Sequence, residues 1–583
     1  MAHTMSEPHL EINEGNLSPE EAYLEEGPGP EEGRPLLSFP GGVPTSNARS
    51  VSLEPFNGGY GSPDAGVAGV KVFGVQEHVN SRKRSGWPSV LLHSSLWTLA
   101  RSFLKSSSGH RHYSFIFLVV SVISLVVILS LYLSEVIIVN STPRNSAIQR
   151  PPFPPVIQNS WGAYTPYFPV QPYPLRPSHC TITQVNLIQR HGARFPTSGA
   201  SARIKAALQK LQSATDFLDP KLKFLENYTY TLGENDLVAF GAAQSVDAGK
   251  EAYNRYSSLI SQDNLPFVRA SLSSRVVHSA NNWTAGFSLA SDEVFTPVLS
   301  VVLDEKLNDT LDDAMCPNAG TSDPQTSTWT SIYGAPIAAR LNAQAPGATL
   351  TSADISNLIP LCAFETLATG NPSPFCDLFA LEEFEQYEYN GDLDKFYGTG
   401  YGQPLGPVQG VGYINELLAR LTESPVRDNT QTNRTLDSSP ITFPVNRTFY
   451  ADFSHDNQMI AIYAAMGLFK QPGPLDPTKM DTDPGRTWVT SHLTPFSGRM
   501  VVERLSCSLT DTSLGRFGRR VDVQRKDDEV ERGTFVRVLV NDALQPLEFC
   551  DGDADGLCAL DAFVRSQAYA RNDGEGDFEK CFS

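Results

Sequence analysis

Residues 181–196 read TITQVNLIQRHGARFP, and this stretch decides the fold. Its first eight residues, Thr181–Ile188, are mostly β-branched or apolar, which predicts a buried strand. The polar segment Arg190–Pro196 follows that strand directly. In open α/β sheets, ligands bind beyond the carboxyl ends of the strands, so we expect a binding site at this segment.

A second strand and polar loop repeat this arrangement later in the chain. Thr448–Phe453 reads as a strand, and the loop Ser454–Asn457 follows it. The next apolar run, Met459–Met466, predicts a helix that Gly467 ends. Ser201–Leu211 also has helical spacing. Strands that alternate with helices predict an α/β fold, and we expect the two polar loops to converge on one ligand.

The residue types in these loops suit phosphate chemistry. Arg190 and Arg194 offer guanidinium groups that match phosphate oxygens, and Gly192 between them lets a phosphate approach closely. The same arginines disfavour a positive charge on His191, which we expect to be a neutral nucleophile. A phosphate ester also needs a proton donor for its leaving group, and Asp456 can serve when it is protonated in the complex.

Together, these residues resemble the histidine acid phosphatases, and specifically their fungal phytase-like branch. The similarity covers nearly all of residues 176–583 and includes RHGARFPT (190–197), VRASLSSRVVHSA (268–280) and YADFSHDN (450–457). It implies a large α/β domain with a smaller, mainly α-helical domain. We place this catalytic domain at 179–583, with a helical insertion at about 290–430. The resemblance further implies hydrolysis of small phosphorylated substrates without a metal or other cofactor.

The resemblance also assigns roles by position. It makes His191 the nucleophile that forms a phosphohistidine, and Asp456 the acid that protonates the leaving group. The implied phosphate clamp consists of Arg190, Arg194, Arg275 and His455.

The chain departs from the phytases at places where those enzymes carry lysines. Here residues 198–203 read SGASAR, and a lysine pair is replaced by Asp394-Lys395. We therefore expect a broad acid phosphatase with a phytase activity that is present but not dominant. A dedicated 3-phytase and a non-enzymatic, phosphatase-like binding domain are the alternatives. A phosphoglycerate-mutase-like transferase shares the Arg-His-Gly nucleophile but is disfavoured by the topology and disulfides described next.

All eight cysteines lie in the last three-quarters of the chain, and their even number fits disulfides in an oxidising compartment. Cysteine spacing alone leaves about 105 pairings open. The resemblance implies the pairs Cys180–Cys507, Cys316–Cys581, Cys362–Cys376 and Cys550–Cys558.

One uncharged run, residues 115–134, is long enough to cross a bilayer as a helix, and we assign a signal-anchor helix at 113–139. Six basic residues and no acidic one lie between His78 and Tyr113, so the N-terminus is expected in the cytosol. Residues 1–112, of which 1–80 are rich in Glu, Gly, Pro and Ser, then form a disordered cytoplasmic tail, and 140–178 form a Pro-rich stalk that wraps the domain.

This type II topology places the catalytic domain in a lumenal or extracellular space, where glycosylation is also expected. Six N-x-[ST] sequons lie on that side, at Asn140, Asn227, Asn282, Asn308, Asn433 and Asn446. The tail segment EGRPLL (32–37) resembles an acidic dileucine sorting signal, which suggests the vacuolar membrane.

The net charge of −19 gives no general attraction to polyanions, so no nucleic-acid partner is expected, and no obligate protein partner is evident. The segment Asp551–Gly556 begins like a calcium-binding loop, but Ala562 occupies the position of the required glutamate. No His/Cys cluster has zinc spacing. The sequence therefore predicts no metal site.

Overall fold

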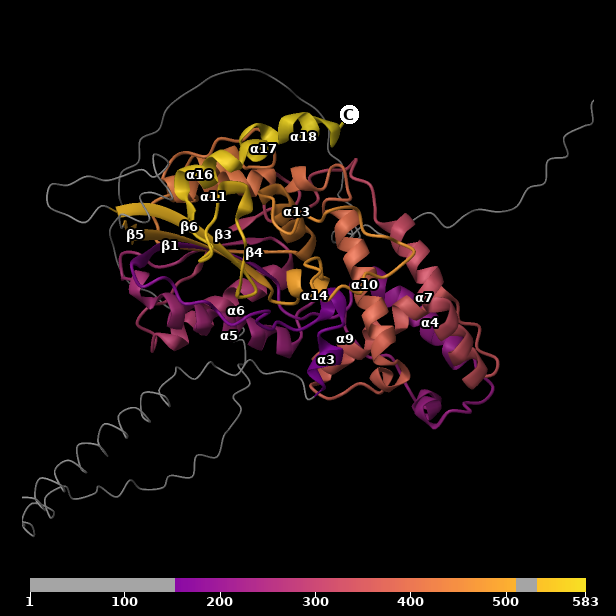
Figure 1. The fold of residues 1–583 in the computed structure, drawn as a ribbon. Helices are drawn as coiled ribbons and strands as arrows, with labels where there is room; N and C mark the ends of the chain where they lie inside the picture. Colours follow the sequence, from indigo (N-terminus) through magenta and orange to yellow (C-terminus); the bar gives the residue numbers. More distant parts are fainter. Residues whose placement is uncertain (1–152, 510–531) are drawn as a thin grey trace, which may run out of the picture. The chain divides into compact units, whose positions relative to one another are not determined.

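The computed structural model describes residues 153–509 and 532–583. Its main feature is a mixed sheet with the strand order β3-β2-β4-β1-β5-β6-β7, in which β8 also pairs with β6. The first four strands in this order run parallel, whereas β5 and β6 pair antiparallel (Figure 1). The strands are β1 (Cys180–Arg190), β2 (Phe267–Ser271), β3 (Leu299–Leu303), β4 (Phe449–Ser454), β5 (Arg499–Ser508), β6 (Arg532–Val540), β7 (Ala543–Leu544) and β8 (Cys558–Ala559).

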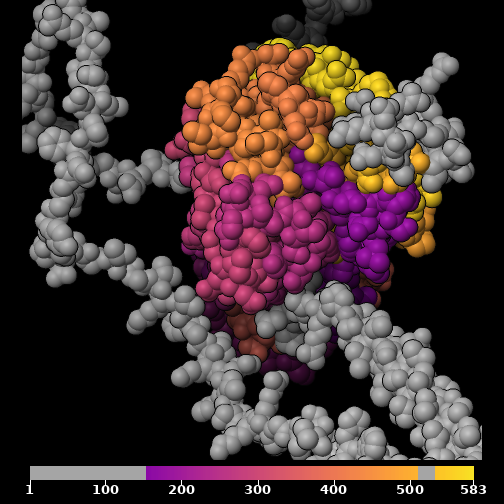
Figure 2. Space-filling model, turned by 90° about the vertical axis from the view of Figure 1, so that its left-hand side faces the viewer, coloured from indigo at the N-terminus to yellow at the C-terminus, as the bar shows by residue number. Residues whose placement is uncertain are grey.

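Helices cover both faces of the sheet, because the side chains of its central strands alternate between two cores. Phe449, Ala451 and Phe453 of β4 pack against helices α5 (Ala239–Tyr256) and α6 (Ser274–Ala290). Tyr450 joins the opposite core, which the following helices line: α11 (Val411–Thr422), α13 (Asp456–Met466) and α16 (Leu560–Ser566). Figure 2 shows the same division on the surface, with magenta residues in one half of this face and orange and yellow residues in the other. The predicted α/β fold is confirmed.

A separate helical lobe packs around its own core beside the sheet (Figure 1). Its helices are α4 (Ser198–Gln212), α7 (Asp323–Gln344), α8 (Ser352–Leu358), α9 (Pro360–Thr369) and α10 (Leu381–Gly398). The lobe therefore differs from the expected insertion at about 290–430. Strand β3 and helix α11 lie within those bounds but belong to the sheet and its covering layer. Helix α4 lies outside them, yet its Ile204 and Leu208 pack in the lobe.

The segment 153–178 is part of the folded domain, whereas we expected it to belong to a stalk. It contains helix α3 (Pro155–Gln158) and the turn η1 (Gly162–Tyr164). Trp161, Tyr167 and Phe168 are buried, because proline-rich chain can still dock its aromatic side chains. The domain thus begins earlier than the predicted residue 179.

The shorter elements connect these layers. They are α12 (Arg434–Asp437), α14 (Thr490–Leu493), α17 (Ala568–Arg571), α18 (Asp577–Lys580), η2 (Pro220–Glu226), η3 (Ser257–Leu259), η4 (Pro374–Leu378), η5 (Pro407–Gly410), η6 (Glu548–Cys550) and η7 (Asp573–Gly576).

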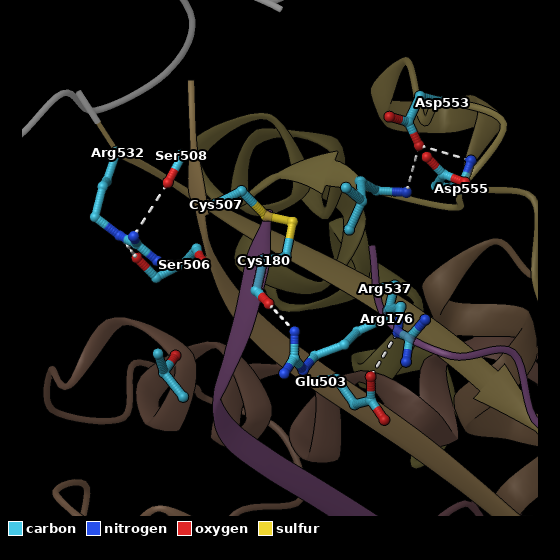
Figure 3. Close-up of a disulfide and its surroundings, with 12 residues drawn as sticks. Arg176, Cys180, Glu503, Ser506, Cys507, Ser508, Arg532, Arg537, Asp553 and Asp555 are labelled. Atoms are coloured by element: carbon cyan, nitrogen blue, oxygen red, sulfur yellow. Dashed lines mark hydrogen bonds and ion pairs between the residues drawn. A yellow bond between two sulfur atoms is a disulfide. The ribbon is translucent and has the colours of Figure 1, made fainter. Parts of the chain in front are cut away.

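Four disulfides join the pairs that the resemblance implied: Cys180–Cys507, Cys316–Cys581, Cys362–Cys376 and Cys550–Cys558. Figure 3 shows the bond between Cys180 at the start of β1 and Cys507 near the end of β5. On the neighbouring strands, Arg537 donates to Glu503, and Arg532 donates to Ser506 and Ser508 (Figure 3). Covalent and ionic links therefore fasten β1, β5 and β6 together.

The predicted tail (1–112), signal-anchor helix (113–139) and first part of the stalk (140–152) lie outside the described residues. Within 153–509 and 532–583, no helix combines the length and apolar character needed to cross a membrane.

Candidate active site

Three neighbouring parallel strands deliver the predicted site residues to one edge of the sheet. Strand β1 pairs with β4 in a register that sets Arg190 opposite Ser454, and the His191 N–H donates to the Ser454 carbonyl at 3.1 Å. Strand β2 pairs with the other side of β4 and leads into the first turn of α6, which carries Arg275. The two polar loops therefore meet, as the sequence predicted.

His191 is fully buried and held in one orientation. Its Nδ1 lies 2.9 Å from the Gly192 carbonyl oxygen. A carbonyl only accepts, so Nδ1 carries the hydrogen and Nε2 keeps its lone pair. No hydrogen-bond partner contacts Nε2. Burial, and then the charges of Arg190, Arg275 and Arg194, hold the pKa of His191 well below its ordinary value of 6.5. The ring is therefore neutral, although burial contributes more to this than the arginines that the sequence argument used.

Arg190 is fixed from several sides. Its Nη1 donates to the carbonyls of Ala163 and, at 2.8 Å, of Thr494, and its guanidinium lies 4.7 Å from the ring centroid of Phe496. Its Nη2 lies 3.2 Å from Asp456 Oδ2. Because Ala163 belongs to the segment predicted as a stalk, that segment helps to position the site.

Asp456 is the first residue of α13 and lies between two cations. Lys395 Nζ is 2.9 Å from its Oδ2, close to the 3.2 Å of the Arg190 contact. Burial alone would raise the pKa of Asp456, but Arg190 and Lys395 outweigh it and hold this pKa well below its ordinary value. The predicted acid is thus a carboxylate in the ligand-free protein.

Lys395 is the site residue that the sequence argument missed. It lies on α10 of the helical lobe, is buried, and donates to Asn457 Oδ1 at 2.6 Å. The only sequence signal was the pair Asp394-Lys395, which we had noted as a departure from the lysines of phytases.

His455 and the remaining arginines complete the group. The His455 ring centroid lies 5.7 Å from that of His191, and His455 Nδ1 is 3.3 Å from Arg275 Nη2. Arg194 is nearly buried and donates through Nη1 to the Phe195 carbonyl at 3.0 Å. Both Arg194 and Arg275 are close enough to His191 to lower its pKa. All six residues predicted for catalysis or phosphate binding are therefore gathered at this strand edge.

Gly192 is required for a reason other than the predicted approach of a phosphate. A Cβ at Gly192 would lie 2.2 Å from the carbonyl oxygen of Gly241 in α5. A Cβ at Gly241 would in turn lie 2.0 Å from the Ala193 carbonyl oxygen. The two glycines let α5 pack against the loop that carries His191.

Among the described residues, two groups have the spacing of metal ligands. The first, His179 with Cys180 and Cys507, has no free thiol because both cysteines form a disulfide. The second is His455 with Glu305 and Asp312. Glu305 Oε1 already accepts hydrogen bonds from the Ser271 hydroxyl at 2.9 Å and the Ser273 N–H at 2.8 Å. We therefore assign no metal to it.

Comparisons with known proteins agree with this geometry. The family model for the histidine phosphatase superfamily (branch 2) matches residues 181–541. Phytase A of Aspergillus oryzae is 38% identical over 448 residues, which cover 73% of this chain and 91% of that protein. Phytase A of Emericella nidulans is 39% identical over 449 residues, which cover 74% and 91%. The crystal structure of the D. castellii phytase shares the fold, with a TM-score of 0.56, 24% identity and coverage of 71% of this chain and 85% of that chain.

Proposed function

Since the chain belongs to the histidine phosphatase superfamily (branch 2) and is a phosphoric monoester hydrolase, we propose that it acts through a phosphohistidine on His191. One observation carries this proposal: His191 Nε2 has no hydrogen-bond partner, while Nδ1 is held by the Gly192 carbonyl. The Nε2 lone pair is therefore available to attack a phosphorus atom that the clamp holds. Family membership also makes the non-enzymatic alternative wrong.

In the first step, His191 Nε2 forms a bond to phosphorus, and the bond from phosphorus to the ester oxygen breaks with its electron pair on oxygen. Asp456 gives this oxygen a proton. Arg190 and Lys395 keep Asp456 ionised in the free enzyme, so the substrate supplies the proton, because phosphate monoesters carry one below about pH 6. In the second step, water attacks the phosphohistidine, Asp456 accepts the proton of water, and His191 is regenerated.

Rapid acid-free quenching after mixing with a ³²P-labelled aryl phosphate tests this mechanism. We expect label on the peptide that contains His191 and none in the variant His191→Ala. His278→Ala is the matched control, because His278 is exposed on α6 and should leave labelling unchanged. Label on another residue, or turnover by His191→Ala, would contradict the mechanism.

For substrate range, we propose broad hydrolysis of phosphate monoesters, with inositol polyphosphates among them. Relatives named Phytase A support the second part. Two features argue against a dedicated phytase. Helix α4 begins with the uncharged Ser198, Gly199 and Ala200, and the cation of Lys395 is already paired with Asp456. The ratio of kcat/KM for phytate to that for an aryl phosphate decides the question, since a strong preference for phytate would favour the dedicated enzyme.

For location, we propose a type II membrane protein with a lumenal or extracellular catalytic domain, on a vacuolar membrane if residues 32–37 sort it there. The disulfides and the exposed sequon residues Asn227 and Asn446 support this side. Glycosidase treatment of Asn→Gln variants, together with protease protection of the tail, tests it. A tail protected inside sealed vesicles would reverse the topology.

A further inference from the structure

A group of carboxyl side chains lies behind His455, on the segment that follows β3. Glu305 Oε1 is 3.4 Å and Asp312 Oδ1 is 3.7 Å from His455 Nε2. Asp309 is buried beside them and is linked to Glu305 through Ser271, whose hydroxyl lies 2.8 Å from Asp309 and 2.9 Å from Glu305. No step of the mechanism above uses these carboxyl groups.

The two ring nitrogens of His455 face opposite surroundings. Nε2 faces Glu305 and Asp312, whereas Nδ1 accepts a hydrogen bond from Arg275 Nη2 at 3.3 Å, because a guanidinium only donates. In the ligand-free protein the ring hydrogen is therefore on Nε2. Other ionisable groups near the ring are Asp309 on the same segment as Glu305, Asp456 next in sequence, and His191, which is neutral and lies 5.7 Å away between ring centroids. Because Arg275 belongs to the phosphate clamp, Nδ1 is the nitrogen on the substrate side.

Glu305 is held as a carboxylate. Burial alone would raise its pKa, but hydrogen bonds from His455, Ser271 and Ser273 outweigh burial and lower the pKa of Glu305 to about 2. Burial raises the pKa of Asp309 to about 7. The single hydroxyl proton of Ser271 cannot serve two carboxylates. At acidic pH, a protonated Asp309 can donate to Ser271, which then donates to Glu305.

We propose that Glu305, assisted by Asp312, is a positioning residue for the phosphate clamp: it accepts the Nε2–H of His455 and favours the doubly protonated ring that donates from Nδ1 to substrate phosphate. Phosphate oxygens carrying negative charge accept hydrogen bonds, so Nδ1 contributes only when it bears a proton. The partner of one imidazole nitrogen determines the state of the other. When substrate phosphate binds, it replaces Nδ1 as the acceptor for Arg275, and Nδ1 takes up a proton to donate to the phosphate. The loaded site would then hold two histidines in opposite states, His191 neutral and His455 cationic.

The test compares Glu305→Gln with the wild-type chain from pH 3 to 7. Glutamine keeps an oxygen for Ser271 and Ser273 but removes the charge. Asp304→Asn is the matched control, because Asp304 is the exposed neighbouring acid and contacts only the Lys306 N–H among the bonds described. The measured quantities are the inhibition constant of inorganic phosphate and kcat/KM for an aryl phosphate, each as a ratio to wild type at the same pH.

For Glu305→Gln we expect phosphate binding within twofold of wild type at pH 3, where solvent protonates the ring. At pH 6, phosphate binding should be about tenfold weaker than in wild type. This corresponds to a shift of one pH unit, towards lower pH, in the alkaline limb of the pH profile for phosphate binding. Asp312→Asn should shift the same alkaline limb in the same direction, but by less. If Glu305→Gln does not fold, Asp312→Asn is used in its place. Asp304→Asn should match wild type.

The proposal would be overturned if phosphate binding by Glu305→Gln were weakened equally at every pH, or were unchanged. The same pH shift in Asp304→Asn would also overturn it. Activation of wild type by a divalent cation that Glu305→Gln abolishes would also overturn it, because the group would then be a metal site. This inference rests on the proposed function, but the failures are distinguishable. If the wild-type enzyme forms no phosphohistidine, the proposed mechanism is refuted. The pH dependence of phosphate binding would still test the role of Glu305 in the clamp, because that measurement does not require a covalent intermediate.

Discussion

Replacing Lys395 with methionine should raise the pKa of Asp456 and shift the pH range in which poor leaving groups depart. Lys395 Nζ and Arg190 Nη2 contact the same oxygen of Asp456 at 2.9 and 3.2 Å, so the lysine supplies roughly half of the attraction. At an effective dielectric constant of 20, one such charge pair is worth about 6 kcal/mol before desolvation. Single opposite charges shift carboxyl pKa values by about 1–3 units in proteins, so we expect a rise in that range.

The assay is kcat/KM for an alkyl phosphate and for an aryl phosphate between pH 4 and 7. The alkyl oxygen needs a proton to depart, whereas the aryl oxygen is already a stable anion. In Lys395→Met, the alkyl-to-aryl ratio at pH 6 should therefore rise about tenfold for each unit of pKa increase. An unchanged ratio, with both substrates slowed equally, would refute this reasoning and show that Lys395 binds phosphate instead. Lys210→Met is the control, because Lys210 forms a similar pair with Asp354, 2.8 Å apart, in the helical lobe.

Three further outcomes are expected. Asp456→Asn should lower kcat/KM for the alkyl phosphate by about 10²–10⁴-fold and for the aryl phosphate far less, so equal losses in a substrate comparison would contradict its role as acid. The pKa of His191 is below 6.5 in the folded chain, so the unfolded chain binds more protons below pH 6.5 and stability falls as the pH falls. In thermal unfolding, His191→Ala should therefore make the difference in Tm between pH 7 and pH 4 smaller, and a larger difference would contradict this. Gly192→Ala should cost about 1–3 kcal/mol in urea unfolding because its Cβ meets Gly241, whereas Gly473→Ala, with open space around it, should cost little; similar losses would refute the packing argument.

The strand-loop-helix units of the site could be predicted because their signals are local. Thr181–Ile188 and Thr448–Phe453 were expected as strands; β1 contains the first, and β4 contains all of the second except Thr448. Gly467 ends α13 in the left-handed conformation, as its position predicted. Parallel strands that lie side by side then bring His191 and Asp456 together without any further information.

The missed features depend on how separate parts of the chain pack. Lys395 reaches Asp456 because α10 of the lobe docks against α13, and no periodicity within α10 reveals which strand end it faces. Glu305 follows a short edge strand within a region that we expected to be a helical insertion. In 153–178, the prolines suggested a stalk that wraps the domain, but only the structure shows that the buried Trp161 and Tyr167 make this segment part of the domain.

The position of β1 also has a consequence for how the chain folds during synthesis. This strand precedes the nucleophile and lies between β4 and β5, and its disulfide to β5 spans 327 residues. Pairings between such distant segments form slowly, because a long loop must close before they contribute. When the ribosome has completed the helical lobe, neither partner strand of β1 has been made, so the backbone groups on both edges of β1 stay unpaired until about the last quarter of the chain is synthesised. Catalytic competence is therefore acquired late, because the strand that leads to His191 can pair only after β4 and β5 have been made.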